Sequence, residues 1–189
     1  MKQTHSNLVL IGMPGSGKST VGVILAKKTL RDFVDTDVFI QTSQQRTLQD
    51  IVDKDGYAFF RKIEEEVLLG LSIQNHVIAT GGSAIYSDQA MTYLKSDGIL
   101  IFLDVDLATL GSRIRDFSSR GISKRPDQSF AELFDERFAL YTKHADITIK
   151  CGDMTQEQVC ERIIVEVTGR KANEGLKQTS NHEASLRVQ

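Results

Sequence analysis

Short apolar runs separated by amphipathic segments make up most of this chain. The runs lack an alternating pattern and occupy residues 8–11, 33–34, 76–80, 99–103 and 147–149. Runs of this kind are typical of strands that are buried on both faces, as in parallel sheets. The segments between them are long enough for crossover helices. The pattern therefore predicts an α/β fold in which helices cover both faces of a parallel sheet.

Two internal stretches and the end of the chain depart from this alternation. Residues 36–72 hold helical patterns, at 48–52 and 59–71, with no central strand, which indicates a small helical insert over the sheet's edge. Residues 117–128 are polar, basic and contain glycine between two helical patterns, which is typical of a mobile lid. Residues 169–189 are polar and lack apolar periodicity, so we expect a disordered tail beyond the last helix.

The composition is typical of one globular domain. A chain of 189 residues is long enough for one core, and we place the domain at residues 1–168. The formal net charge of −2 gives no reason to expect nucleic acid or an anionic membrane as a partner, and no apolar stretch is long enough to span a membrane. Cys151 and Cys160 are too few for a disulfide framework, which suits a reducing compartment. We therefore expect a cytoplasmic protein that is a monomer.

The strongest chemical signal is the segment Gly12-Met13-Pro14-Gly15-Ser16-Gly17-Lys18-Ser19, which fits the phosphate-loop pattern G-x-x-x-x-G-K-[ST]. An apolar run precedes it and a helical pattern follows it, as the motif requires. Glycine lets successive backbone N–H groups turn toward an anion, and the new helix adds its positive dipole end. Lys18 is expected to contact the β and γ phosphates, and the Ser19 hydroxyl is expected to bind Mg²⁺. The predicted nucleotide-binding residues of the loop are Gly15, Ser16, Gly17, Lys18, Ser19 and Thr20.

Asp35 and Asp37 follow the second apolar run, at the carboxyl end of a predicted strand. In extended backbone, side chains at i and i+2 point the same way, so one carboxylate can approach Mg²⁺ beside Ser19 while the other orients an acceptor hydroxyl and takes its proton. An aspartate before a helical pattern is equally typical of a helix cap. The phosphate loop nearby favours the active-site interpretation.

Two further motifs lie on the same predicted edge. Arg61 and Glu64 share one helical face, so the carboxylate can hold the guanidinium while its fork meets an acidic ligand, although a solvated ion pair gives the same spacing. Gly81 and Gly82 follow the third apolar run, where backbone amides can approach a small ligand or simply form a tight turn.

Three arginines later in the chain are candidates for the same pocket. Arg125 lies in the predicted lid, from which it can neutralise charge on a transferring phosphoryl group. Arg137 can face an acidic ligand or pair with a neighbouring acid, and Arg113 can cover an adenine ring or remain at a solvated helix end. Together with Asp37 and Arg61, these residues predict a closed pocket for a small hydroxylated acid.

These motifs together resemble the shikimate kinases over roughly residues 7–168. The resemblance implies a P-loop fold of the nucleoside-monophosphate-kinase type: three layers, α/β/α, with a five-stranded parallel sheet, a helical substrate-binding insert and a lid. The shared residues, in order and approximate spacing, are Gly12 to Ser19, Asp35-Thr36-Asp37, Gly56, Phe60-Arg61, Glu64, Thr80-Gly81-Gly82, Arg125-Pro126, Arg137, Tyr141 and Ala145-Asp146.

The resemblance also implies ATP- and Mg²⁺-dependent phosphorylation of the 3-hydroxyl of shikimate, a step of aromatic amino acid biosynthesis. By this carry-over Asp35 acts through the metal shell and Asp37 is the candidate base. Lys18 and Arg125 stabilise the moving phosphoryl group, with Arg125 as the lid arginine. The residues implied to bind shikimate are Asp37, Arg61, Gly82 and Arg137, with Gly81 in the same glycine turn.

Several positions depart from the family pattern, and they cluster on the acceptor side, including the lid. They are Val52 for a phenylalanine, Tyr57 for an acidic residue, Ser83 for the third glycine, and Asp127-Gln128 for a Leu-Leu pair. Two alternatives therefore stand beside shikimate phosphorylation: a kinase of another small hydroxylated acid such as gluconate, and an ATP-binding regulator that does not catalyse transfer.

Overall fold

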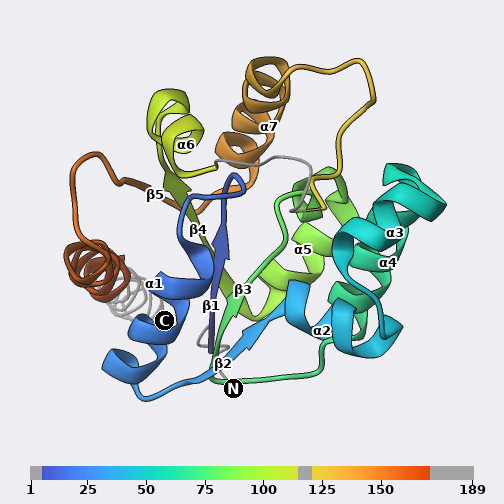
Figure 1. Cartoon of the computed structure of the whole chain (residues 1–189). Coiled ribbons are helices and arrows are strands. Elements are labelled where there is room, and N and C mark those ends of the chain that lie inside the picture. The colour runs from blue at the N-terminus through green and yellow to red at the C-terminus, as the bar shows by residue number, and fades with distance from the viewer. Residues whose placement is uncertain (1–5, 115–120, 171–189) are drawn as a thin grey trace, which may run out of the picture.

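Five parallel strands form the sheet of this computed structural model, which describes residues 6–114 and 121–170. The strands are β1 (Asn7–Ile11), β2 (Asp32–Asp35), β3 (His76–Ala79), β4 (Gly98–Asp104) and β5 (Ile147–Lys150), in the order β2-β3-β1-β4-β5. Every apolar run of the sequence thus contributes a strand. All four strand pairings are parallel, so the carboxyl ends of the strands meet at one edge (Figure 1).

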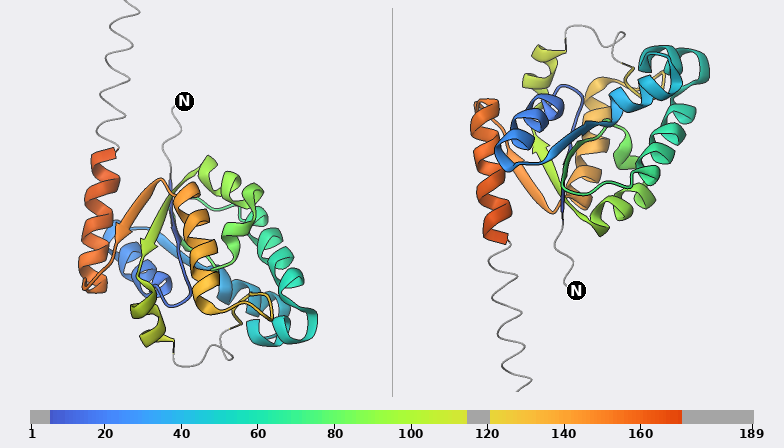
Figure 2. Two further views of the ribbon diagram at one scale, coloured as in Figure 1. Left: turned by 90° about the horizontal axis from the view of Figure 1, so that it is seen from above. Right: turned by 90° about the horizontal axis from the view of Figure 1, so that it is seen from below.

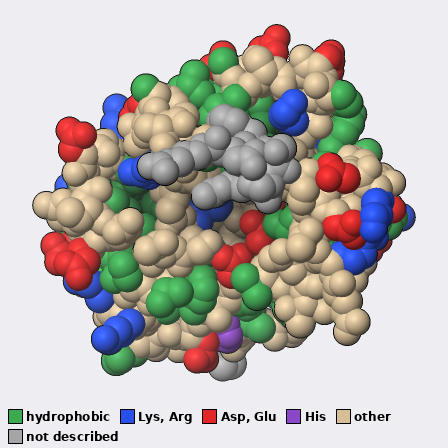
Figure 3. Space-filling view, viewed as in Figure 1, with side chains coloured by type: hydrophobic (Ala, Val, Ile, Leu, Met, Phe, Trp, Pro, Cys, Tyr) green, Lys and Arg blue, Asp and Glu red, His purple; other side chains and the backbone are tan. Residues whose placement is uncertain are grey.

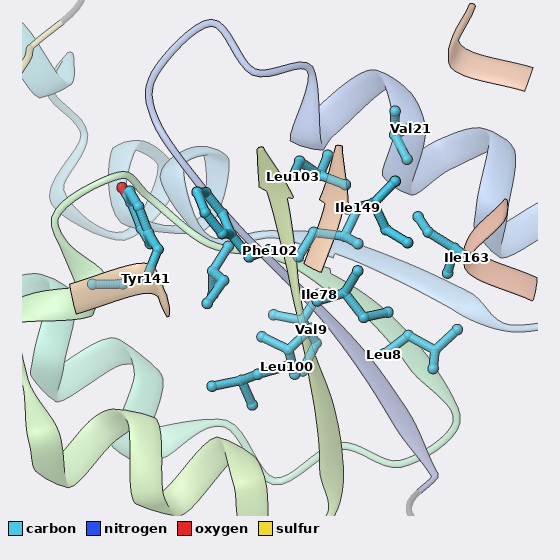
Figure 4. Packing of buried hydrophobic residues seen from close by; sticks show 14 of the residues in the cluster. Leu8, Val9, Val21, Ile78, Leu100, Phe102, Leu103, Tyr141, Ile149 and Ile163 are labelled. Carbon is cyan, nitrogen blue, oxygen red and sulfur yellow. The ribbon is translucent and has the colours of Figure 1, made fainter. Parts of the chain in front are cut away.

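The sheet is buried because its central strands are apolar on both faces. All five residues of β1 are buried, and β1 pairs with β4 from Asn7 opposite Gly98 to Ile11 opposite Phe102. Leu8, Val9, Ile78 and Leu100 pack into one continuous core (Figure 4). Burial on both faces explains the absence of polar alternation in these strands.

Helices cover the two faces of the sheet in the three-layer arrangement. On one side lie α1 (Lys18–Thr29) and a helix over residues 156–170, and on the other lie α5 (Asp88–Ser96) and α7 (Phe130–His144) (Figure 2). The short helix α6 (Leu107–Arg113) follows β4. Gly22 lets α1 approach the sheet closely, because a Cβ there would lie 2.4 Å from a ring carbon of Phe33.

The predicted helical insert consists of α2 (Thr36–Gln44), α3 (Leu48–Asp55) and α4 (Tyr57–Gly70). It has a small core of its own, in which Ile40, Ile51, Phe60 and Ile63 are buried. A 3₁₀ turn, η1 (Ala84–Tyr86), links β3 to α5. The insert packs beside the sheet at the β2 end (Figure 1), which places α2 and α4 next to the strand termini.

The predicted lid and tail are only partly within the described residues. Residues 117–120 of the lid and 171–189 of the tail lie outside them. The described part of the lid contacts α3, where Gly121 N–H donates to Gln49 Oε1 over 2.7 Å. The last helix extends to residue 170, slightly past the predicted start of the tail.

Cys151 and Cys160 are buried and free of disulfide bonds. Among the described residues, no helix has both the length and the apolar character needed to cross a membrane.

Candidate active site

A cavity of about 570 Å³ lies at the carboxyl ends of β1, β2 and β3. Ligands of open parallel sheets bind at this edge, where the chain leaves the central strands in different directions. Basic and acidic side chains meet in the hollow of this face (Figure 3). The predicted site residues that line the cavity are Gly15, Gly17, Lys18, Ser19, Thr20, Asp35, Asp37, Gly82, Arg113 and Arg137.

The phosphate loop is folded around its own lysine. Gly15 and Gly17 have φ angles of 82° and 95°, which favour glycine. Lys18 Nζ donates to the carbonyl oxygens of Gly12 (2.8 Å) and Met13 (2.9 Å), so the ammonium is held inside the loop. Burial lowers the pKa of Lys18 to about 8, against the opposing effect of Asp37. A phosphate in the loop would restore the charge that burial disfavours.

Asp35 and Asp37 have different local roles. Asp35 caps α2, accepting a hydrogen bond from the Asp37 N–H over 3.0 Å, and it also lines the cavity. The cap expected from the sequence is therefore present, and the same side chain also faces the cavity. Asp37 Oδ1 is buried without a hydrogen-bond partner among the described residues. Burial raises the pKa of Asp37 to about 6, which is suitable for a group that takes a proton near neutral pH.

Glu64 is a second buried carboxylate beside Asp37. Its side chain is 1% exposed, and burial, followed by the charge of Asp37, raises its pKa to about 7. Its Oε2 accepts a hydrogen bond from Ser83 Oγ over 2.5 Å, whereas Oε1 has no partner in the described structure. A Cβ on Gly81 would lie 2.1 Å from Glu64 Oε1 and 2.6 Å from Asp37 Oδ1. Glycine at position 81 therefore makes room for two carboxylates.

Arg137 is a buried cation that lines the cavity. It is 1% exposed, and its Nη2 donates to the Ser123 carbonyl oxygen over 2.5 Å. Gly82 is needed here, since a Cβ would lie 2.8 Å from Arg137 Nη1. Tyr141 fixes the same turn by donating to the Gly82 carbonyl oxygen over 2.6 Å. The glycine turn is thus held between α7 and the phosphate loop.

Comparisons with known proteins show the family of this chain. The sequence model described as "Shikimate kinase" matches residues 14–168. A shikimate kinase from Aquifex aeolicus is 37% identical over 163 residues, covering 86% of this chain and 96% of that protein. This chain belongs to the shikimate kinase family. It is an ATP-dependent phosphotransferase with an alcohol acceptor, as the resemblance implied.

Solved structures of the family share the fold. Shikimate kinase from Acinetobacter baumannii, solved in complex with shikimate, has a TM-score of 0.82 and 30% identity, covering 89% of this chain and 96% of its own. The structure of the Aquifex aeolicus enzyme has a TM-score of 0.76 and 36% identity, covering 87% of this chain and 98% of its own. The P-loop kinase architecture expected from the sequence is confirmed.

In this shikimate kinase family member, the expected contact between Arg61 and Glu64 does not form. Arg61 Nε instead donates to Ser123 Oγ over 3.2 Å, and its guanidinium lies over the ring of Tyr86. Glu64 instead accepts a hydrogen bond from the Ser83 hydroxyl. Arg61 therefore contacts Ser123, which lines the cavity, but Arg61 does not line the cavity itself.

The lid arginine is also outside the cavity. Arg125 Nη1 pairs with Glu136 Oε2 at 3.1 Å on an exposed surface, and Gln128 Nε2 donates to the same oxygen over 2.7 Å.

Arg113 does reach the phosphate loop, where its Nη1 donates to the Gly15 carbonyl oxygen over 3.3 Å. The Gly81 N–H donates to Thr36 Oγ1, so it is used within the fold.

Four features of the site could not be predicted from the sequence. They are the contacts of Ser123, of Tyr86 and of Glu136, and the burial of Glu64. Each gains its role from a contact between distant segments, such as Tyr86 OH donating to Glu136 Oε1 over 2.6 Å. The one available signal was Ser83, a departure from the family at a glycine turn. The sequence could not show which carboxylate that hydroxyl would bind.

The residues present fit a magnesium–nucleotide complex. Ser19 and Asp35 both line the cavity beside the phosphate loop and offer oxygen ligands. No cluster of three metal-binding side chains occurs in the residues that the structure describes. Mg²⁺ accepts such a sparse set because it retains waters and takes further oxygens from nucleotide phosphates.

Proposed function

We propose that this enzyme transfers the γ-phosphoryl group of ATP to the 3-hydroxyl of shikimate, giving shikimate 3-phosphate and ADP for aromatic amino acid biosynthesis. The proposal depends on one observation: a single cavity joins the phosphate loop to Asp37 and Arg137. A carboxylate base, a buried arginine and a phosphate cradle are what a carboxylated alcohol needs for in-line transfer. The shikimate in the Acinetobacter baumannii relative supports this acceptor.

In the proposed reaction, the acceptor carboxylate binds Arg137, with Arg61 as the second cation. Asp37 Oδ1 accepts the proton of the acceptor hydroxyl while that oxygen forms its bond to the γ-phosphorus. The bond from the γ-phosphorus to the bridging oxygen breaks, and ADP retains the electron pair. Lys18 and the loop N–H groups stabilise the charge on the phosphate oxygens.

Two predicted participants must change partners for this reaction. Arg125 reaches the phosphoryl group only by leaving Glu136, and Arg61 exchanges its contact with Ser123 for the acceptor carboxylate while it stays over the Tyr86 ring. Both rearrangements involve the segment that contains the predicted lid. A lid that closes on bound substrates also excludes water as a competing acceptor.

We also propose that Ser19 and Asp35 hold Mg²⁺, with Asp35 acting through a metal-bound water. The ion would neutralise charge on the β and γ phosphates. Asp35 retains one oxygen for this role, because its cap to Asp37 N–H uses Oδ1. Arg113, which contacts the phosphate loop, is the proposed cover for the adenine.

The remaining proposals concern the molecule as a whole. We propose a single kinase domain at residues 1–168, with an insert at about 36–72 and a lid at about 117–128, followed by a polar tail whose first two residues, 169 and 170, continue the last helix. We propose a cytoplasmic monomer without nucleic acid or membrane as partner. The two unpaired buried cysteines support the reducing compartment.

The deciding experiment is a coupled ADP-release assay with shikimate, gluconate, homoserine and nucleoside monophosphates as acceptors. Shikimate should accelerate ADP release far above basal hydrolysis, and mass spectrometry should find shikimate 3-phosphate. Acceleration only by gluconate would replace the proposal with a kinase of another hydroxylated acid. Tight ATP binding without turnover for any acceptor would replace it with a non-catalytic regulator.

A further inference from the structure

Tyr86 touches both arginines that are assigned to the acceptor. The Cζ atom of Arg61 lies 3.5 Å from the centre of the Tyr86 ring, and Arg137 Nε donates to the Tyr86 hydroxyl over 3.5 Å. The same hydroxyl donates to Glu136 Oε1 over 2.6 Å, which fixes the orientation of the ring. Tyr86 stands at the end of η1, directly after the glycine turn.

The Arg61 guanidinium has no carboxylate partner among residues 6–114 and 121–170. Its contacts are the Tyr86 ring, the Tyr57 ring at 5.2 Å and Ser123 Oγ. Glu64, the nearest acid on its own helix, instead accepts from Ser83. Within the described residues Arg61 thus forms no ion pair, and Glu136 acts on its charge only from a distance.

Support by a ring has a different consequence from support by a carboxylate. A carboxylate occupies the N–H groups at the edge of the guanidinium, which are the groups that bind an acidic ligand. A ring contacts the face of the guanidinium and leaves those edge N–H groups available. The arrangement around Tyr86 thus holds Arg61 in place without consuming its binding capacity.

We propose that Tyr86 is a positioning residue for the acceptor carboxylate, whose ring holds the Arg61 guanidinium and whose hydroxyl links Arg137 to Glu136. This inference rests on the proposed function, because it assigns the two arginines to the carboxylate of shikimate. It predicts that the ring of Tyr86 matters for acceptor affinity more than its hydroxyl does, since Arg137 has a second, shorter bond to Ser123.

The test compares Tyr86→Phe, which keeps the ring, with Tyr86→Leu, which removes it. Tyr86→Leu should raise the KM for shikimate by roughly 3- to 30-fold, the range of a partly desolvated cation–π contact. Its KM for ATP should stay within about twofold of wild type, and Tyr86→Phe should change the KM for shikimate by less than about threefold. An unchanged shikimate KM in Tyr86→Leu, or an equal rise for both substrates, would overturn the inference.

A double-mutant cycle separates positioning from a general structural effect. In the Arg61→Ala background, Tyr86→Leu should lose most of its effect on shikimate affinity, because no guanidinium remains for the ring to hold. An undiminished effect would contradict the inference. Tyr93→Leu on α5 is the matched control: Tyr93 is 39% exposed and donates to the Leu71 carbonyl oxygen, away from the lining of the cavity. Circular dichroism checks folding, and Tyr86→Met replaces Tyr86→Leu if the latter does not fold.

The function and the inference fail in different ways. Shikimate phosphorylation by the wild-type enzyme tests the function alone. If turnover is absent, the same variants are compared by the Kd for shikimate, which needs no phosphoryl transfer. A wild-type chain that binds no shikimate would overturn both.

Discussion

The phosphate side and the acceptor side of the cavity are built in different ways. On the phosphate side, one contiguous loop closes on itself, with Lys18 bonded to carbonyl oxygens five and six residues earlier. On the acceptor side, Asp37, Glu64, Ser83 and Arg137 come from four separate segments. The first side is determined by local backbone geometry, and the second depends on how the insert and α7 pack against the sheet.

Because of this difference, we expect a substitution on the phosphate side to lower activity more than a substitution on the acceptor side. A change in the phosphate loop removes an interaction that no neighbour can replace. On the acceptor side, Glu64 accepts from Ser83 and Arg61 donates to Ser123, so both residues depend on contacts with other segments. We therefore expect the acceptor side to tolerate single substitutions better than the phosphate side.

Lys18→Ala should have the largest effect on activity. It removes the only side-chain cation held inside the described phosphate loop, and a cation that stabilises a transferring phosphoryl group contributes a rate factor on the order of 10³ to 10⁵. We expect kcat to fall about 10⁴-fold in the ADP-release assay. The matched control is Lys27→Ala, on the exposed side of α1, which should keep wild-type kcat. Loss below tenfold in Lys18→Ala would show that the loop does not act on the moving phosphoryl group.

Asp37→Asn should have the second largest effect, on the acceptor side. The amide keeps the shape of the side chain but cannot take the hydroxyl proton, and a positioned base contributes a rate factor of about 10² to 10⁴. We expect kcat to fall about 10³-fold with little change in the Kd for ATP. Asp32→Asn, at the exposed start of β2, is the control. A fall in ATP affinity that matches the fall in kcat would place Asp37 on the nucleotide instead of the acceptor.

These two residues also show how far the sequence could predict the structure. The phosphate loop was predictable because its pattern is contiguous and its flanks are a strand and a helix. All five strands were predictable for a similar reason, since burial on both faces leaves an apolar run. The partner of Arg61 was not predictable, because spacing on α4 favoured Glu64 and only tertiary packing brings Tyr86 and Ser123 to it. Family resemblance likewise named Arg125 without showing its contact with Glu136.

Glu64→Gln should change stability and its dependence on pH. The pKa of Glu64 rises from 4.5 to about 7 on folding, so the folded state keeps a proton that the unfolded state has lost between these values. Stability of the wild-type enzyme should therefore fall as pH rises from about 5 to about 8. At about pH 8 the neutral variant should be more stable by about 2 to 3 kcal/mol, and its stability should vary less with pH.

Denaturant unfolding at a series of pH values measures this effect. The amide oxygen of the introduced glutamine would still accept from Ser83 Oγ, so the hydrogen bond itself is not the variable. Glu66→Gln on the exposed side of α4 is the matched control and should keep the wild-type pH dependence. If Glu64→Gln and wild type were equally stable across the whole pH range, the pKa of Glu64 would not be raised by folding, and the prediction would be wrong.

Glu136→Gln should have the smallest effect, because it acts on an exposed pair. Arg125 pairs with Glu136 while its side chain is 50% exposed, and such pairs contribute at most about 1 kcal/mol. Releasing Arg125 should raise kcat/KM for ATP by up to about fivefold if the arginine must leave Glu136 before transfer. Asp135→Asn, exposed at the neighbouring position, carries the same charge change and should have no such effect.

Added salt screens exposed charges, so it should raise the wild-type kcat/KM for ATP toward that of Glu136→Gln. If Glu136→Gln lowers kcat/KM, then Glu136 assists transfer by holding Arg125, and the acceptor side is as rigid as the phosphate loop.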